Sequence, residues 1–354
     1  MKNRTFIAVL FVLFLFVSCE EIYNPTIETV PGQLIVESHL TNDPAQNFVK
    51  LSTTRSFYSN LPAVKVVGAK VTLTQVGGAA QKGIEGDFGF FTFPKTPEPG
   101  KKYLLQIQYQ NNNYESTQVL MPPLPTIDTL YTPAATNKTY TTSVYGSPTL
   151  VEDPGRNISI DAPISPSLEY YRFNYRAVLQ WIYNPPATMG PPPPSWYGWT
   201  SVSSKELFNI AGPKDFSVSD KIQNHPVLFL PFNSQQYLDS IQQMPEGWIV
   251  IIDEYGITKE SYDFHKKLNQ QFSAEGSLFD PVNTQVYGNI HCTNDPSKIA
   301  LGFFDLNSYR QYRYFLNLSV NDKAGIQRRL NRYLAISDKG YLIGYCPAFW
   351  EYNY

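Results

Sequence analysis

The chain has 354 residues, with 28 Lys or Arg against 30 Asp or Glu, so its formal net charge is −2. No cluster of basic residues appears anywhere in the sequence, and this disfavours a nucleic acid as a partner. Aromatic residues make up 15% of the chain and charged residues only 16%, and the abundance of Tyr, Thr, Val and Ile favours strands over helices. We therefore expect a mainly β protein, long enough for two domains of ordinary size.

Residues 1–18 have the organisation of an export signal. Lys2 and Arg4 precede an apolar run from Phe6 to Val17. As a helix this run would be about 18 Å long, which is short of the roughly 30 Å hydrocarbon core of a bilayer. We expect a cleaved signal peptide. Ser18 before Cys19 resembles a bacterial lipobox, in which Cys19 becomes the first mature residue and carries the acyl chains. An ordinary signal peptide with an incidental cysteine is the alternative.

Residues 19–30 are expected to form a short tether. Two or more acyl chains on Cys19 would hold the protein stably on a membrane without a transmembrane segment. Glu20 and Glu21 follow directly. Acidic residues at this place resemble the signal that sends lipoproteins of Bacteroidota to the outer face of the outer membrane. The other interpretation is that the two carboxylates belong only to a solvated tether.

Residues 31–124 are predicted to form an N-terminal Ig-like or transthyretin-like β-sandwich. Short segments of strand composition recur about every 8–12 residues, which is typical of a sandwich. Gly86 to Phe93, followed by Pro99 to Tyr103, resembles the carboxypeptidase-regulatory-like or transthyretin-like sandwich, a module that is usually structural or adhesive. Met121-Pro-Pro-Leu-Pro125 cannot continue a strand ladder, so we place the domain boundary there. The predicted strands are 34–40, 48–54, 69–76, 88–93, 101–109 and 114–120.

Residues 125–354 are predicted to form a larger β-rich domain, sandwich or barrel-like, with one amphipathic helix. Residues 131–157 are rich in Thr, Ser, Pro, Gly and Asn and suggest a long surface excursion. The helix is expected over 259–272, with Thr258 as its N-cap and Gly276 as its C-terminal stop. Its apolar stripe is Tyr262, His265, Leu268 and Phe272. The predicted strands are 157–161, 170–183, 227–232, 248–253, 299–304, 309–320 and 341–345.

Two cysteines remain after Cys19. Cys292 and Cys346 would meet an oxidising compartment in an exported chain, so one disulfide is a possible pairing. Two buried unpaired thiols are the alternative, because the sequence alone does not bring their Cα atoms together.

The sequence offers no catalytic motif and no metal-binding motif. The four histidines lack the i, i+4 spacing of a zinc helix, and neither a nucleophile elbow nor a phosphate loop is present. We therefore expect no cofactor, no metal and no enzymatic activity. The best candidates for ligand binding are Trp196, Tyr197 and Trp199, in a proline-braced loop whose rings could stack on a glycan or grip a peptide. Alternatively, these rings fold back and cover the edge of the second domain.

A wider resemblance follows from the order of several short motifs. Among them are Leu34-Ile-Val-Glu-Ser-His-Leu-Thr-Asn42, Glu169-Tyr-Tyr-Arg-Phe173, Ser261-Tyr-Asp-Phe264 and Phe279 to Ile290. Together they resemble the Bacteroidota outer-membrane lipoproteins catalogued as domain of unknown function family 4249. Members often lie beside TonB-dependent receptors, and the family has no established catalytic residues. Its C-terminal region often ends in a Cys-rich segment, of which this chain keeps only Cys346.

The resemblance implies a function at the cell surface. We expect a surface-exposed outer-membrane lipoprotein that is a non-catalytic accessory or ligand-binding component of a TonB-dependent transporter. Its partners would be the outer membrane, through the lipid anchor, and the receptor barrel. The alternative is a structural or adhesive envelope lipoprotein. A hydrolase acting on glycans or peptides is a weaker third interpretation, because nothing in the sequence selects a pair of carboxylates.

Overall fold

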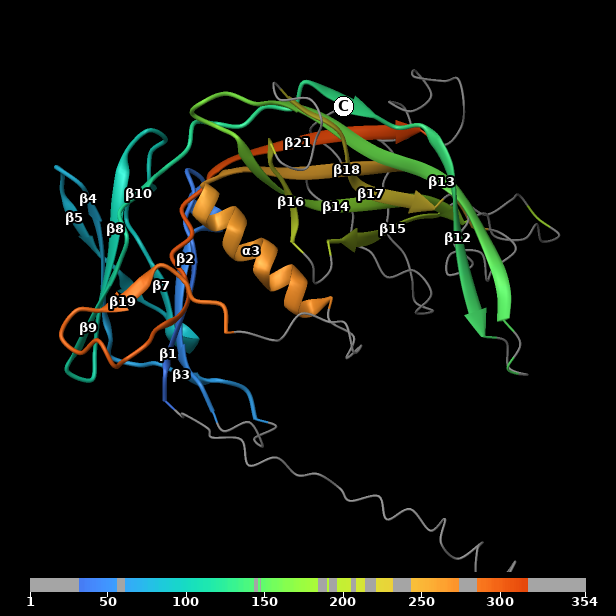
Figure 1. Ribbon diagram of the computed structural model, residues 1–354. Coiled ribbons are helices and arrows are strands. Elements are labelled where there is room, and N and C mark those ends of the chain that lie inside the picture. The colour runs from blue at the N-terminus through green and yellow to red at the C-terminus, as the bar shows by residue number, and fades with distance from the viewer. Residues whose placement is uncertain are drawn as a thin grey trace, which may run out of the picture.

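The computed structural model shows a mainly β protein with four sheets and one α-helix in its described part (Figure 1). The fold class predicted from the sequence is confirmed. In the described part of the chain the sheets pack in pairs and form two sandwiches, and none of these sheets closes into a barrel. The described residues are 32–55, 61–142, 146, 148–183, 190, 196–204, 208–213, 221–231, 243–273 and 285–317.

The first sandwich is built from two sheets of short strands. The first sheet has the order β20-β1-β2-β7-β6, with β3 paired to β2. Its strands are β1 (Leu34–His39), β2 (Phe48–Thr53), β3 (Val64–Lys65), β6 (Ile84–Glu85), β7 (Phe90–Thr92) and β20 (Leu301–Phe303). The second sheet has the order β19-β9-β8-β4-β5, with β10 paired to β8. Its strands are β4 (Lys70–Gln75), β5 (Ala80–Lys82), β8 (Lys102–Tyr109), β9 (Asn112–Ser116), β10 (Val119–Leu120) and β19 (Ile290–Cys292). Two 3₁₀ turns, η1 (Pro44–Gln46) and η2 (Asp87–Gly89), lie between strands.

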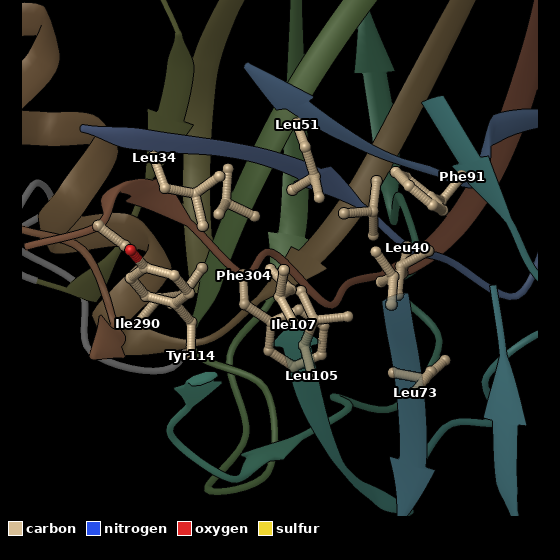
Figure 2. Packing of buried hydrophobic residues seen from close by; sticks show 14 of the residues in the cluster. Leu34, Leu40, Leu51, Leu73, Phe91, Leu105, Ile107, Tyr114, Ile290 and Phe304 are labelled. Atoms are coloured by element: carbon tan, nitrogen blue, oxygen red, sulfur yellow. The ribbon is translucent and has the colours of Figure 1, made fainter. Parts of the chain in front are cut away.

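Alternation along the strands builds the core between these two sheets. In β8 the side chains of Tyr103, Leu105 and Ile107 are buried and those between them are more exposed, as expected where one face of a strand meets the core. Leu34 and Leu51 point to the same interior from the first sheet (Figure 2).

The first sandwich also contains residues from late in the chain. β20 pairs in parallel with β1, and β19 pairs with β9. Ile290, Cys292 and Phe304 belong to the same core cluster as the N-terminal strands (Figure 2). The predicted domain boundary between residues 124 and 125 therefore leaves two strands of this sandwich out, because β19 and β20 follow that boundary in the sequence but pair with strands of the first sandwich.

The second sandwich has longer strands. One sheet has the order β11-β13-β12, with β17 paired to β13, and the other has the order β15-β14-β18-β21, with β16 paired to β14. The bounds are β11 (Thr129–Tyr131), β12 (Ala134–Thr142), β13 (Pro148–Pro163), β14 (Tyr170–Tyr183), β15 (Trp196–Ser203), β16 (Asn209–Ala211), β17 (Lys221–Pro231), β18 (Gln243–Ile257) and β21 (Ser308–Asn317). Buried residues of β13 and β17 pack against buried residues of β14 and β18, among them Trp248.

Residues 131–157 differ from their predicted form. They are not an irregular excursion, because β12 and β13 form a long antiparallel hairpin that pairs from Ala134 with Arg156 to Thr142 with Pro148. Most side chains of β12 are exposed. Thr and Tyr favour extended backbone even where they bury little surface, and this preference outweighs the loop-like composition.

The predicted helix is present as α3 (Lys259–Phe272), and it begins at Thr258 as expected. The Thr258 Oγ1 atom accepts a hydrogen bond from the Ser261 N–H at 3.2 Å. Tyr262 and His265 are buried, whereas Phe272, the last helical residue, is exposed. The proposed stop at Gly276 lies outside the described residues. Figure 1 shows α3 in the angle between the two sandwiches.

The chain crosses between the two sandwiches twice within the described residues. The first crossing follows β10 and leads through Pro122 and Pro123 to β11, and the second leads from β20 to β21. At the second crossing the backbone of Asn307 donates a hydrogen bond to the carbonyl of Leu40, and the N–H of Leu40 donates to the carbonyl of Asp305. These bonds hold the end of β1 beside the start of the second sandwich.

Candidate functional site

A cluster of buried polar side chains lies where the two sandwiches and α3 meet. Its members are His39 at the end of β1, Arg172 in β14, Ser261 and His265 on α3, and Asp305 after β20. All except His39, which is partly exposed, are buried. We call these five residues the junction cluster. They come from four separate parts of the sequence, since only Ser261 and His265 share an element, so the packing of the sandwiches and α3 assembles them.

Arg172 is the centre of the junction cluster. Its Nη1 atom lies 3.0 Å from Asp305 Oδ2 in a buried ion pair and 3.4 Å from His265 Nε2. Its Nη2 atom lies 3.2 Å from His39 Nδ1. The guanidinium also lies over the Tyr255 ring, with Cζ 4.6 Å from the ring centroid. Arginine can only donate hydrogen bonds, so both histidine nitrogens must accept.

This requirement fixes the tautomers of the two histidines. His265 accepts at Nε2, so its proton is on Nδ1, which lies 3.3 Å from Ser261 Oγ. The Ser261 hydroxyl in turn donates to Asp305 Oδ1 at 2.7 Å. His39 accepts at Nδ1 and so carries its proton on Nε2. Both imidazoles are therefore neutral in this arrangement.

The electrostatics of the cluster agree with this assignment. Burial and the charge of Arg172 lower the pKa of His39 to about 4. Burial likewise lowers the pKa of His265 to about 4, against the opposing effect of Asp305. Burial alone would raise the pKa of Asp305, but the charge of Arg172 and the Ser261 hydrogen bond outweigh it and lower that pKa. The cluster therefore holds one cation and one anion at neutral pH.

The cluster contains Ser, His and Asp but lacks the geometry of a nucleophilic triad. In such a triad the histidine accepts the serine proton and the carboxylate orients the histidine. Here Ser261 donates its proton to Asp305 directly, and the His265 nitrogen nearest to Ser261 carries a proton. The Ser261 side chain is also buried. The arrangement suits the structural joining of two domains and not nucleophilic attack.

A cavity of about 800 Å³ opens beside the junction cluster. This volume is within the range of small-molecule sites. One part of the wall is apolar and aromatic, with Phe264 stacked on Phe303 at 4.7 Å between ring centroids. Another part is polar, with His39, Gln46 and Asn174. An aromatic wall with a few amide and imidazole groups is suited to a ligand that has both apolar and hydrogen-bonding surface, such as a sugar or a short peptide.

The aromatic residues predicted to bind ligand lie elsewhere. The backbone of Trp196, Tyr197 and Trp199 forms β15, which pairs with the far half of β14, so this segment is a strand and not the predicted loop. Trp, Tyr and Thr favour extended backbone, and the pairing with β14 makes this segment a strand. The side chains of residues 196–202 are outside the part of the structure that is described, so their role in binding stays a prediction.

The predicted residues near the termini are placed only in part. Cys292 is buried in β19, where its thiol lies 3.2 Å from Asn294 Oδ1. Cys346, its predicted disulfide partner, and Cys19, the predicted lipidation site, lie outside the described residues. The pairing and the lipidation therefore remain predictions.

Sequence reasoning did not find the junction cluster. Arg172 is 133 residues from both His39 and Asp305, so no spacing within the sequence joins them. One local signal existed: a histidine at position 265 in the apolar stripe of a helix. A buried polar side chain needs a partner, and this need could have led to a search for one.

Within the described residues, no group of His, Cys, Asp and Glu side chains is arranged to hold a metal ion. No helix in that part of the chain has the length and apolar character needed to cross a membrane.

Comparison with protein families identifies a family whose members the chain resembles over most of its length. The family described as a domain of unknown function (DUF4249) matches residues 20–313. No curated protein matches the chain significantly, and neither does any solved structure.

Proposed function

The chain belongs to the family described as domain of unknown function DUF4249, and on this premise we propose that it is a surface-exposed outer-membrane lipoprotein. In this proposal it binds and does not catalyse, as an accessory or ligand-binding component of a TonB-dependent transporter. The observation that carries the proposal is Cys19 at the end of a short apolar signal. The family match begins at Glu20, directly after it.

The lipid anchor is tested through Cys19. We expect that Cys19→Ser abolishes incorporation of an alkyne-labelled fatty acid and moves the protein from the outer-membrane fraction to the soluble fraction. Cys292→Ser is the matched control, because that thiol is buried in β19 and should leave labelling unchanged. Labelling that survives in the Cys19→Ser protein would contradict the anchor.

The transporter association is tested by purification of the wild-type protein from outer membranes in mild detergent. We expect a TonB-dependent barrel to co-purify with it, and the same barrel to be absent when Cys19→Ser is the bait. Recovery of the monomer alone would reject the association. Protease treatment of intact cells separates surface display from a position inside the envelope.

The cavity beside the junction cluster is the proposed place of a glycan or peptide ligand. Phe264 forms part of its wall, so Phe264→Ala should weaken binding at least tenfold in calorimetric titration with oligosaccharides and short peptides. Phe272→Ala is the control, because Phe272 is on the same helix and is exposed. Equal affinity of the two variants would place the ligand elsewhere.

A structural or adhesive envelope protein is the second candidate. The buried ion pair between Arg172 and Asp305 favours it, because a joint of this kind holds two sandwiches at one angle, as a spacer requires. Deletion of the gene would then change attachment or envelope integrity. A growth defect on one nutrient only would support the transporter association instead.

A further inference from the structure

Three rings lie in a row on the outer face of the first sheet. His39 is in β1, Phe48 in β2 and Phe90 in β7, and all three side chains are partly exposed. The ring centroids of His39 and Phe48 are 6.1 Å apart, and those of Phe48 and Phe90 are 5.5 Å apart. We call these three residues the aromatic strip. Rings at such distances are in contact, so the strip is one continuous surface.

The strand register places the aromatic strip on one face of the sheet. His39 is paired with Phe48, and Lys50, two residues after Phe48, is paired with Phe90. Paired residues in a sheet share a face, and so do residues two apart in a strand. All four side chains are therefore on the same side. Val49 points to the opposite side, into the core of the first sandwich, so the aromatic strip is turned away from that core.

The aromatic strip continues the cavity beside the junction cluster. His39 and Phe48 belong to the wall of that cavity, and Phe90 is the ring next to Phe48. A ligand that is longer than the cavity therefore meets Phe90 where it leaves the cavity across Phe48.

The charged side chains along this path neutralise each other. On the outer face the Lys50 ammonium lies 2.7 Å from Glu37 Oε1, and the two side chains are 32% and 49% exposed. The same ammonium lies 5.8 Å from the centroid of the Phe90 ring. Beside the cavity Arg172 and Asp305 form a second ion pair. The path thus offers donors and acceptors without net charge, which suits a neutral ligand rich in hydroxyl groups, because each hydroxyl both donates and accepts.

A sugar chain fits this face better than a peptide does. Peptides commonly bind by adding a strand to the free edge of a sheet. β1 lies between β20 and β2, and β2 lies between β1 and β7, so both strands are already paired on either side. What this face presents to a ligand is the rings and the ion pair. Sugars stack their C–H faces on aromatic rings and bond their hydroxyl edges to charged groups.

The aromatic strip is also twisted. The planes of His39 and Phe48 are inclined at 42°, and those of Phe48 and Phe90 at 59°. Successive rings therefore do not share one plane. Such a strip does not match the flat face of a packed, insoluble polysaccharide, and it suits a single soluble chain that turns from one sugar to the next.

We propose that the cavity and the aromatic strip form one binding site for a neutral oligosaccharide chain. One end of the chain occupies the cavity, and the following sugars cross Phe48 and Phe90, with hydroxyl groups bonded to Lys50 and Glu37. The inference rests on the ligand-binding function proposed above, and it narrows the ligand class from glycan or peptide to neutral glycan. It also assigns Phe90 to the site, as the ring that only a longer chain reaches.

The test is calorimetric titration of the mature full-length protein in a detergent without a sugar headgroup. The probes are linear oligomers of glucose, mannose and xylose, each as disaccharide and hexasaccharide, with oligogalacturonate and short peptides for comparison. In at least one neutral series we expect the hexasaccharide to bind at least tenfold more tightly than the disaccharide. Phe90→Ala should remove this advantage and leave the disaccharide affinity unchanged, whereas Phe264→Ala should weaken both.

Two further variants guard against an effect on folding. Phe90→Tyr keeps the ring and should keep the tighter binding of the hexasaccharide. Tyr140→Ala removes an exposed ring from β12 in the second sandwich and should change neither affinity. A reduction of both affinities in Phe90→Ala, or equal affinity of hexasaccharide and disaccharide in the wild type, would overturn the role of the aromatic strip.

The comparison probes separate failure of this inference from failure of the proposed function. A peptide that binds more tightly than every neutral sugar, and is lost in Phe264→Ala, would overturn the sugar assignment but keep the ligand-binding function. Tighter binding of oligogalacturonate would likewise reject a neutral ligand. Absence of binding to all of these probes would overturn both.

Discussion

At the scale of single residues, the second sandwich buries a carboxyl group, that of Glu254 in β18, although Glu side chains are seldom fully buried. Its side chain is fully buried, and neither carboxyl oxygen has a hydrogen-bond partner among the described residues. Burial raises its pKa to about 8, although Arg310 opposes this effect. The carboxyl group is therefore protonated at neutral pH. A neutral acid in an apolar sandwich avoids the large cost of burying an unpaired charge.

We predict that Glu254→Gln stabilises the protein increasingly as the pH rises. The unfolded chain releases the Glu254 proton above about pH 4.5, but the folded chain keeps it to about pH 8. Folding thus takes up a proton in this window, and the free energy of unfolding falls as the pH rises. By pH 7 the loss amounts to about 3 kcal/mol, which the glutamine variant does not suffer. Urea unfolding at pH 5, 6, 7 and 8 measures the difference.

Glu152→Gln provides the control for this measurement. Glu152 is an exposed residue in a surface ion pair with Lys138, and such pairs contribute little to stability. Its stability difference from the wild type should not rise with pH. If Glu254→Gln lowered the stability at pH 7, the buried carboxyl group would have to be ionised and paired.

At the scale of elements, the sequence predicted well where the signal is local. β14 has the predicted bounds 170–183, and α3 begins at its predicted N-cap Thr258. An N-cap is a local signal, because it needs only a hydroxyl side chain and the backbone N–H groups of the first helical turn. The strand predicted over 299–304 contains β20, but β19 is not predicted, and neither is the pairing of these two strands with β1 and β9. Pairing across so long a separation leaves no local pattern.

The same reason separates the predicted site from the observed one. Trp196, Tyr197 and Trp199 were selected by residue type within one segment, which is the kind of signal that a sequence shows. Arg172 and Asp305 are ordinary charged residues in the sequence, and their importance comes from burial and from the 3.0 Å contact between them. A single sequence shows composition and period, but neither of these reports which surfaces become buried against one another.

At the scale of the whole molecule, the junction cluster joins the two sandwiches through polar contacts rather than through a continuous apolar core. The core of the first sandwich and that of the second are separate clusters. Between them, Arg172 from the second sandwich contacts His39 and Asp305 beside the first. A buried ion pair contributes little net stability, but loss of one partner leaves an uncompensated charge. The angle between the sandwiches therefore depends on every member of the cluster staying in its charge state.

We predict that acidification weakens this joint. His39 and His265 have a pKa of about 4 in the folded protein and about 6.5 in the unfolded chain. The unfolded chain binds more protons between these values, so the contribution of both residues is complete above about pH 6.5 and is lost toward pH 4. At pH 5 the loss is about 2 kcal/mol for His265 and less for the partly exposed His39.

Glu254 acts in the opposite direction over the same range, so the wild-type curve alone does not isolate the histidines. The comparison is between wild type and His39→Gln with His265→Gln, by urea unfolding from pH 7 to 5. The double variant should show a weaker loss of stability on acidification, and exposed His291→Gln should follow the wild type. Parallel curves for the wild type and the double variant would show that neither junction histidine changes its pKa on folding.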